Sequence, residues 1–484
     1  MYTSDPIQNW FTQLDRRVYA LLIGAVIGVS GGVIGLLLAV AGPVVGVAAV
    51  LGGLVGLYVL TDVSAALYAV IFTMILLPFG VMPVKIAITP TLLDVALGAF
   101  ILVYLFQWMS GKRRFIQVTP VHALVIVYML WMILSFVLGL RYAPPTSANL
   151  RQFAETLISI SMVFILVDLL RDPKALRRLV LIVVIAISIE TLVTLVLYAV
   201  PEATTEYLLV RLSRIGYPDG GVVRYIEDNP ALAERAIGTW VDPNLLGGMM
   251  TISATLIASQ LFAARPILRW RWLTLILFGL VCTALVLSYS RASMLALALG
   301  LFIIALARYR RYLPILIVGG LLLLLLPQTQ YLMDRFVQAF TGSDLSTQMR
   351  LGEYGDSLRL ISRYPIFGVG FTGTPEIDLY TDVASMYLIM ANQIGLVGVA
   401  IFVTTMTALF TYGVRAWRFA ARKRADLDAV HLGLHAALFV LLANAAGDLY
   451  FFRLDFQASI TLLWIIVGMA LASSRIALTP EPPN

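Results

Sequence analysis

Charged residues are scarce in this chain, since Asp, Glu, Lys and Arg make up only 13% of its 484 residues. A soluble domain keeps roughly 25% charged residues, because its surface faces water. Here 60% of the residues are hydrophobic and the mean hydropathy is +0.91. The chain contains repeated apolar runs, and about 20 apolar residues span the hydrocarbon core of a bilayer. The scarcity of charge excludes a soluble globular protein and predicts an all-α, polytopic integral membrane protein.

Cysteine and histidine are also scarce. The single cysteine, Cys282, excludes an intramolecular disulfide and a cysteine metal site. Its place in an apolar run favours a small buried side chain. His431 and His435 lie four residues apart, which places them on one helix face, but no third ligand is evident nearby. We therefore expect no metal and no cofactor.

The apolar runs define about fourteen candidate membrane spans, and short neighbours could merge to leave twelve or thirteen. They cover residues 18–40, 43–60, 63–80, 91–109, 121–140, 149–170, 178–200, 244–263, 272–289, 292–307, 312–327, 384–414, 429–447 and 456–474. We expect about 12–14 transmembrane helices.

Most of the basic residues fall in short loops on one side of this span arrangement. The clusters are Arg16 and Arg17; residues 112–114; Arg171, Lys174, Arg177 and Arg178; residues 265–271; residues 308–311; residues 415–424; and Arg475. Because cytoplasmic loops carry an excess of Lys and Arg, this side is predicted to be cytoplasmic, with both termini. The net charge of +7 follows this topology, so no nucleic-acid partner is expected.

The spans divide the chain into five predicted parts. These are N-terminal transmembrane helices (1–200), a first extracytoplasmic loop (201–243), central transmembrane helices (244–327), a second extracytoplasmic loop (328–383) and C-terminal transmembrane helices (384–484). Both loops should carry short helices. One of them is expected near residues 346–363, with apolar Met349, Leu358 and Ile361 among polar residues.

Ionisable side chains gather at the predicted extracytoplasmic side. Asp94, Arg151, Glu155 and Glu190 lie in the outer halves of spans, where charge is costly and suggests function. The outer loops add arginines, and Arg291 falls in a very short turn between two spans. A basic, partly buried cavity of this kind suits an anionic substrate such as phosphate. The alternative is that these arginines pair with loop acids or extend to lipid headgroups.

Four sequence elements between residues 235 and 400 resemble, in order, elements of the O-antigen ligase and O-antigen polymerase family. From Arg235 to Gly247 the chain reads RAIGTWVDPNLLG, which contains Asn244 and resembles the family's "R..GTF.NPN..G". SRASMLAL, beginning at Ser290, resembles its "SRG..LAL" turn. The stretch from Arg350 to Gly370, ending YPIFGVG, resembles its second-loop element. SMYL from Ser385, followed by GLVG, resembles its "HN.YL......GL.G" element.

The resemblance implies a glycosyltransferase that works on undecaprenyl-diphosphate-linked glycans at the outer face of the bacterial plasma membrane. It implies neither a metal nor a nucleotide sugar. Arg235 and Arg291 would hold the diphosphate, with Arg291 acting in catalysis, and Arg350 would support them. Asn244, Ser385 and Tyr387 would contribute to substrate binding. Besides the lipid-linked glycan and membrane lipids, the expected partners are a chain-length regulator or other polysaccharide-assembly proteins.

One position departs from the family pattern. The family's ligases carry a histidine, proposed as the base, where this chain has Ala384. Asp382 is the nearest ionisable group and is predicted to activate the acceptor hydroxyl, with Glu353 and Asp378 as alternatives. This departure favours a polymerase that joins lipid-linked repeat units. A ligase that transfers glycan to an acceptor, or a transporter or binding protein for lipid-linked glycan, are the alternatives.

Overall fold

The computed structural model describes residues 56–82, 89–314, 345–374, 382–419 and 421–479, together with positions 52, 53, 317, 318, 337 and 341. The chain divides into two compact units, residues 1–66 and residues 67–484. The site lies entirely in the second unit.

The described residues form an almost entirely helical protein. The helices are α3 (Val63–Leu76), α4 (Leu92–Met109), α5 (His122–Gly139), α6 (Ser147–Leu169), α7 (Pro173–Ala199), α8 (Glu202–Val210), α9 (Pro243–Leu261), α10 (Arg271–Leu287), α11 (Arg291–Arg308), α14 (Leu345–Arg363), α15 (Met386–Phe419), α16 (Asp428–Asn444) and α17 (Gln457–Leu478). Short 3-10 turns are η1 (Arg211–Ile215), η2 (Ile226–Asp228), η3 (Gly238–Trp240), η4 (Arg310–Tyr312) and η5 (Ala421–Lys423). The strands β1 (Arg224–Tyr225) and β2 (Glu234–Arg235) pair antiparallel.

This architecture confirms the all-α membrane fold. Seven described helices are long and apolar enough to cross a membrane, and three shorter apolar helices accompany them. Their ends follow the predicted spans closely: α6 covers Ser147–Leu169 where a span over 149–170 is expected. Residues 18–40 and most of 43–60 and 312–327 lie outside the described residues. The total of 12–14 spans therefore stays a prediction.

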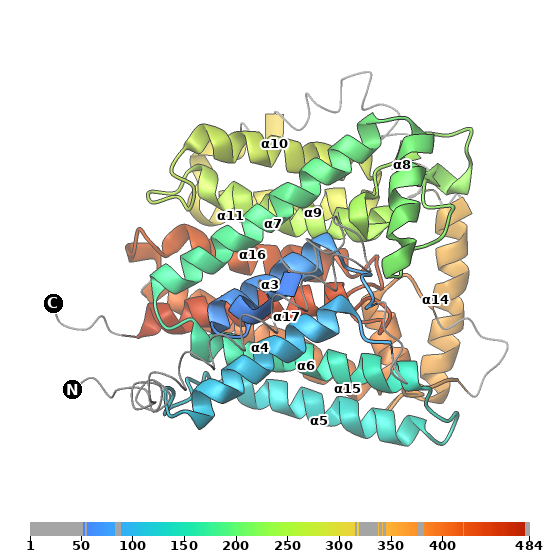
Figure 1. Ribbon diagram of the computed structural model, residues 1–484, viewed down its shortest axis with the longest axis horizontal. Coiled ribbons are helices and arrows are strands. Elements are labelled where there is room, and N and C mark those ends of the chain that lie inside the picture. The colour runs from blue at the N-terminus through green and yellow to red at the C-terminus, as the bar shows by residue number, and fades with distance from the viewer. Residues whose placement is uncertain are drawn as a thin grey trace, which may run out of the picture. The chain divides into compact units, whose positions relative to one another are not determined.

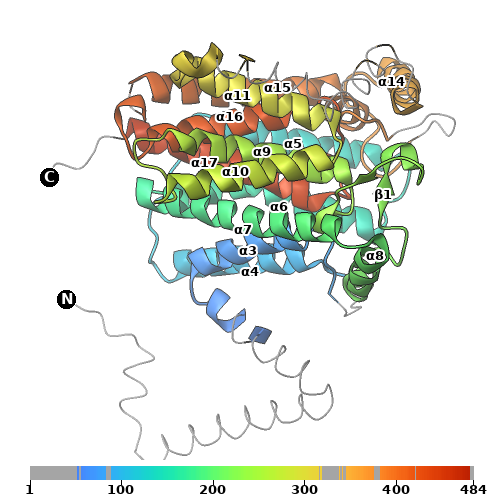
Figure 2. The ribbon, with the colours of Figure 1, turned by 90° about the horizontal axis from the view of Figure 1, so that it is seen from above.

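The long helices of the second unit run side by side, and α8 and α14 both lie at one end of the bundle, on opposite sides of it in Figure 2 (Figures 1 and 2). We call this the loop end. The helix α17 packs against α6, α15 and α16, while α9 packs against α10, α11 and α16. Almost every described side chain of α9 and α17 is buried, so these two helices form the centre of the bundle.

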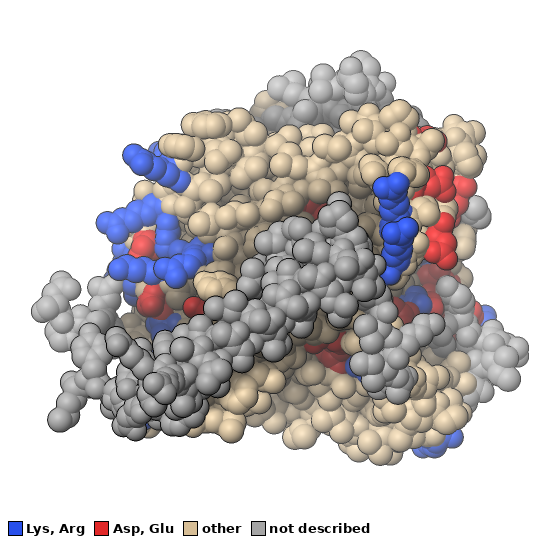
Figure 3. Space-filling view, in the orientation of Figure 1, with Lys and Arg blue, Asp and Glu red and all other residues tan. Residues whose placement is uncertain are grey.

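The opposite end of the bundle is basic. Lys and Arg gather there in Figure 3, at the left of the view. At this end the predicted basic loops 171–178 and 265–271 connect α6 to α7 and α9 to α10, respectively. The structure therefore places these loops together at one end, which we call the basic end. That this end faces the cytoplasm stays a prediction from the positive-inside rule.

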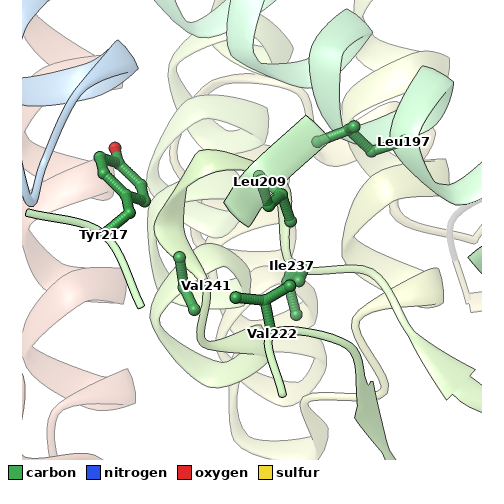
Figure 4. Close-up of a cluster of buried hydrophobic side chains, with 6 residues drawn as sticks. All are labelled: Leu197, Leu209, Tyr217, Val222, Ile237 and Val241. Carbon is green, nitrogen blue, oxygen red and sulfur yellow. The ribbon is translucent and has the colours of Figure 1, made fainter. Parts of the chain in front are cut away.

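The segment between α7 and α9 folds around a small apolar core of its own. Leu197, Leu209, Tyr217, Val222, Ile237 and Val241 are its buried members, and Figure 4 shows Leu209, Val222, Ile237 and Val241 between Tyr217 and Leu197. Phe79 and Val193 pack against this cluster. Burying these side chains fixes the path of the chain on either side of β2, so the residue at its end has a defined position.

Candidate functional site

Three arginines expected at the site line one cavity at the loop end. This cavity, which we call the arginine pocket, has a volume of about 80 Å³. It is lined by Ile226, Glu227, Arg235, Asn244, Tyr289, Ser290, Arg291, Ala292 and Arg350. A buried water needs about 10–15 Å³ of such space, so the pocket holds several water-sized groups and has room for a phosphoryl group. Three cations around so small a space favour an anion.

Arg235 is held rigidly by the loop that carries it. It ends β2, where it lies opposite Arg224. Its Nε donates to the carbonyl oxygen of Ser288 at 2.8 Å, and its Nη2 donates to Oδ1 of Asn244 at 2.7 Å. Asn244 lies in the first turn of α9, which begins with Asp242 as N-cap and Pro243. Arg235 and Asn244, each expected to bind substrate, are thus in direct contact, and this contact orients the guanidinium at the pocket.

Arg291 is positioned by a sharp turn between two helices. The helix α10 ends at Leu287 and α11 begins at Arg291, so only Ser288, Tyr289 and Ser290 connect them. Tyr289 adopts a left-handed backbone conformation with φ of 52°, which is costly for a bulky side chain. Such strain persists only where the surrounding structure enforces it, and it clusters at functional sites. Here it leaves both Tyr289 and Arg291 lining the pocket.

Arg350 reaches the same pocket from α14, the amphipathic helix expected near residues 346–363. Hydrogen bonds fasten α14 to the start of α15: Glu353 accepts from the Ala384 amide at 3.0 Å, and Tyr354 donates to the Ala384 carbonyl at 3.2 Å. Ser357 donates to Asn392 at 3.0 Å. The position of the family's histidine is therefore an attachment point for the helix that carries Arg350. It does not line the arginine pocket.

A buried carboxyl group lies behind the pocket, and sequence reasoning missed it as a site residue. Asp448, between α16 and α17, is only 3% exposed. Asn444 donates to its carboxylate at 3.2 Å and accepts from Ser293 at 3.1 Å. Ser293 in turn contacts Ser290 at 2.8 Å, which completes a polar chain from Asp448 to the Arg291 turn. The only feature of the sequence that pointed to Asp448 was its place in the last loop on the predicted extracytoplasmic side.

Burial raises the pKa of the Asp448 carboxyl to about 7, and the positive charge of Arg350 opposes this rise. Asp242 raises this pKa further, while Arg235 lowers it. Two of the three pocket arginines thus interact electrostatically with Asp448. The charge on this carboxyl group changes near neutral pH, so the net charge around the pocket changes with it.

The remaining predicted site residues lie apart from the pocket lining. Asp382 forms an ion pair with Arg453 at 3.2 Å, and 40% of its side chain is exposed. Ser385 is buried at the start of α15. The hydroxyl of Tyr387 donates to the carbonyl oxygen of Leu442 at 2.8 Å, inside the bundle. Asp378 lies outside the described residues.

The ionisable residues within the spans have structural partners. Arg151 contacts Asp94 at 2.8 Å and Glu155 at 3.3 Å, which forms a compact ion cluster. Glu190 accepts hydrogen bonds from the amide and the hydroxyl of Thr239, both at 2.8 Å. None of these four residues lines the arginine pocket. Glu190 nevertheless helps to position the pocket residues. It holds Thr239 in the η3 turn, which connects Arg235 to Asn244.

The resemblance elements separate into two groups in space. The first two, with Arg350, supply the pocket. The YPIFGVG and GLVG elements instead pack on each other: the Leu396 amide donates to the Pro365 carbonyl at 2.8 Å, and the Val369 amide donates to that of Asn392 at 2.8 Å. Gly395 interrupts α15 with φ of 69°, and a side chain there would collide with the Ile366 carbonyl. Gly368 and Gly370 likewise have positive φ and close backbone neighbours, so the glycines of both elements are required for packing.

No group of three or more His, Cys, Asp or Glu arranged to hold a metal occurs among the described residues. The rings of His431 and His435 are tilted at 37° to each other with centroids 4.2 Å apart, and Nδ1 of His431 contacts Ser473 at 2.9 Å. Both lie in α16, on the side of the bundle away from the arginine pocket. The charged residues that line the arginine pocket are Arg235, Arg291, Arg350 and Glu227.

Comparison with known proteins agrees with the sequence motifs. A family model described as O-antigen ligase matches residues 276–403, from within α10 to within α15. The matched segment contains Arg291 and Arg350, whereas Arg235 and Asn244 precede it. A search of curated proteins found no match to the chain. The family match indicates glycan transfer of the ligase or polymerase type. Residues 276–403 of this membrane protein are thus similar to the O-antigen ligase family.

Proposed function

We propose that this protein polymerises undecaprenyl-diphosphate-linked repeat units at the extracytoplasmic face of the plasma membrane, with the diphosphate in the arginine pocket. The observation that carries this proposal is the convergence of Arg235, Arg291 and Arg350 on one cavity from three distant parts of the chain. In this proposal a phosphoryl group occupies the cavity, which is large enough for it, and the sugars lie outside. The lipid tail would lie in the membrane beside the loop end.

The reaction requires stabilisation of a leaving group. A hydroxyl oxygen of the acceptor glycan bonds to the anomeric carbon of the donor sugar, and the bond from that carbon to the diphosphate oxygen breaks. The departing lipid diphosphate gains one negative charge. Cations fixed before the reaction stabilise this developing charge without reorganising, which is commonly the largest electrostatic contribution to catalysis. Arg235, held by Ser288 and Asn244, is fixed in this sense.

The acceptor hydroxyl must also lose its proton to a base. Glu227 supplies the carboxylate among the residues that line the pocket, and its backbone is left-handed with φ of 56°. We propose Glu227 as this base and keep Asp382 as the second candidate. Asp382 is closer in sequence to the position of the family's histidine, but its contact with Arg453 directs it elsewhere.

Polymerase is preferred to ligase because of Ala384. A ligase mechanism that uses the family's histidine has no equivalent group here, and Ala384 is occupied in fastening α14. A transporter would need charged groups along a path across the membrane. The arginine pocket is instead confined to the loop end, which favours chemistry at one face.

The test uses the purified full-length protein in nanodiscs with undecaprenyl-diphosphate-linked repeat units from the native organism, and follows glycan length by gel and mass spectrometry. Arg291→Ala should abolish chain growth. Arg359→Ala is the matched control, because Arg359 lies on α14 with its side chain 69% exposed and paired with Asp356. Glu227→Gln and Asp382→Asn, compared in parallel, identify the base.

Each outcome decides one point. Longer glycans from wild type and Arg359→Ala, but not from Arg291→Ala, establish a polymerase with a diphosphate site. Transfer of one intact glycan to a non-lipid acceptor, without growth, would instead establish a ligase. If glycan length never changes while labelled lipid-linked glycan still binds through Arg291, the protein is a binding or carrier protein and the enzymatic proposal fails.

A further inference from the structure

A second, much larger cavity lies at the basic end of the bundle. Its volume is about 910 Å³, which is within the range of small-molecule sites. Its basic lining residues are Arg308, Arg310, Arg311, Arg418, Arg422 and Lys423. They come from the end of α11, the η4 turn, the end of α15 and the η5 turn. The proposed glycan transfer at the loop end makes no use of this cavity.

The cavity carries a large excess of positive charge. Asp428 is the one carboxylate among the described residues that line it. Both oxygens of Asp428 are already engaged: Oδ2 pairs with Nε of Arg308 at 3.0 Å, and Oδ1 accepts from Nε1 of Trp417 at 3.0 Å. The described lining therefore has one acidic residue and six basic residues, and the carboxylate of the acidic residue is already paired with Arg308 and Trp417. Such a concave positive surface attracts an anion.

Aromatic side chains line the same cavity or lie next to its lining residues. The guanidinium of Arg422 lies 5.4 Å from the ring centroid of Trp417, and that of Arg311 lies 4.7 Å from that of Tyr312. Phe262 stacks on Tyr312 with centroids 4.8 Å apart. Trp and Tyr are typical of the headgroup level of a membrane, where apolar and polar surroundings meet. The cavity combines this interfacial character with its charge.

The helix α11 places the cavity at the opposite membrane face from the arginine pocket. Arg291 at its start lines one site, and Arg308 at its end lines the other. At about 1.5 Å per residue its 18 residues span about 27 Å, close to the thickness of a bilayer's hydrocarbon core. The large cavity therefore lies at the level of the lipid headgroups on the predicted cytoplasmic side, where anionic lipids are abundant.

We propose that this basic cavity binds the phosphate headgroup of an anionic phospholipid, of the phosphatidylglycerol type. The shared chemistry is a phosphate monoanion, and the lipid is preferred to a soluble phosphate because the cavity lies at headgroup level among interfacial aromatic residues. Arg311 of the η4 turn and Arg422 of the η5 turn are the residues proposed to contact the headgroup. Each basic side chain near a membrane surface contributes about a fivefold gain in affinity, so removal of two should cost about 25-fold.

The test titrates the full-length protein in detergent with phosphatidylglycerol or phosphatidylcholine and counts bound lipids by native mass spectrometry. The variant is Arg311→Gln with Arg422→Gln. The matched control is Lys112→Gln with Arg114→Gln, which removes two exposed charges from another loop at the basic end. Arg310→Gln with Lys423→Gln is a second cavity variant, in case the first fails to fold. Inorganic phosphate and glycerol 3-phosphate serve as soluble competitors.

The expected result is tight phosphatidylglycerol binding that both cavity variants weaken about 25-fold and the control leaves within about twofold of wild type. Equal losses in the control would mean that only general surface charge matters, and would overturn the proposal. Equal binding of phosphatidylcholine would overturn it as well. Cavity-dependent binding of inorganic phosphate as tight as that of the lipid would assign the cavity to a soluble anion instead.

Discussion

Asp448→Asn should make the stability of this protein less dependent on pH. In the wild type, burial raises the pKa of the Asp448 carboxyl from its ordinary value of 3.8 to about 7. Between these values the folded protein holds a proton that the unfolded chain releases, so stability falls as pH rises. The loss begins above pH 3.8 and is complete above pH 7. The amide that replaces the carboxyl group is neutral throughout, so the variant escapes this loss.

The magnitude follows from the shift in pKa. Each pH unit between the two pKa values costs about 1.4 kcal/mol, so the full loss is about 4 kcal/mol. Between pH 5 and pH 8 the wild type should lose about 3 kcal/mol that the variant keeps. The substituted amide can still accept the hydrogen bond from Asn444, so the two proteins should be similarly stable at low pH. The advantage of the variant should therefore appear only as the pH is raised.

The assay is denaturant unfolding of the detergent-solubilised protein at pH 5, 6.5 and 8, with the free energy of unfolding compared between variant and wild type. Asp455→Asn is the control, since Asp455 lies in the same loop with its side chain 50% exposed and paired with Arg453. An exposed pair contributes about 1 kcal/mol or less. A constant difference between Asp448→Asn and wild type at all three pH values would refute the reasoning. So would a variant that is less stable at every pH, because Asp448 would then act mainly as an ionised partner of the arginines.

Three further substitutions test how the pocket is built. Gly395→Ala places an alanine in a left-handed backbone conformation, with its Cβ against the Ile366 carbonyl, so the free energy of unfolding should fall by about 2–5 kcal/mol. Gly352→Ala is the control: it has open space around it and should change stability by less than about 1 kcal/mol. Asn244→Ala removes the acceptor that aims Arg235, so pyrophosphate affinity measured by calorimetry should fall about tenfold while thermal stability changes little; unchanged affinity would show that the contact is dispensable. Glu190→Ala leaves two buried donors unpaired and should lower the free energy of unfolding by about 3 kcal/mol, with Glu190→Gln restoring part of it.

The membrane helices were predictable because their signal is local. Apolar runs end where charged side chains begin, and α5 (His122–Gly139) therefore agrees with a span expected over 121–140. The helix α14 was predictable for the same reason, from apolar residues spaced among polar ones. The pocket arginines were found through motifs, and the structure adds that Arg235, Arg291 and Arg350 line one cavity. Their roles in binding and catalysis stay predictions.

The rest of the site depends on contacts between distant residues, which one sequence does not reveal. Asp448 joins the pocket through the contact of Asn444 with Ser293, 151 positions earlier in the chain. Glu227 gains its place from a left-handed backbone in a loop without periodicity. Asp382 was expected at the site because it is two residues from Ala384, and its role as the base stays a prediction. The structure adds its ion pair with Arg453, which the sequence did not indicate.

The dispersal of the pocket along the chain has a consequence for biosynthesis. Arg235 and Asp448 are separated by about 210 residues, so at about 5–20 residues per second they leave the ribosome about 10–40 s apart. Within that interval Arg291 is made first, then α14 and α16, and the carboxyl group behind the pocket comes last. A nascent chain halted before α16 has no Asn444 for Ser293 to contact. We therefore expect glycan transfer only from chains that have completed membrane insertion almost to their C-terminal helix.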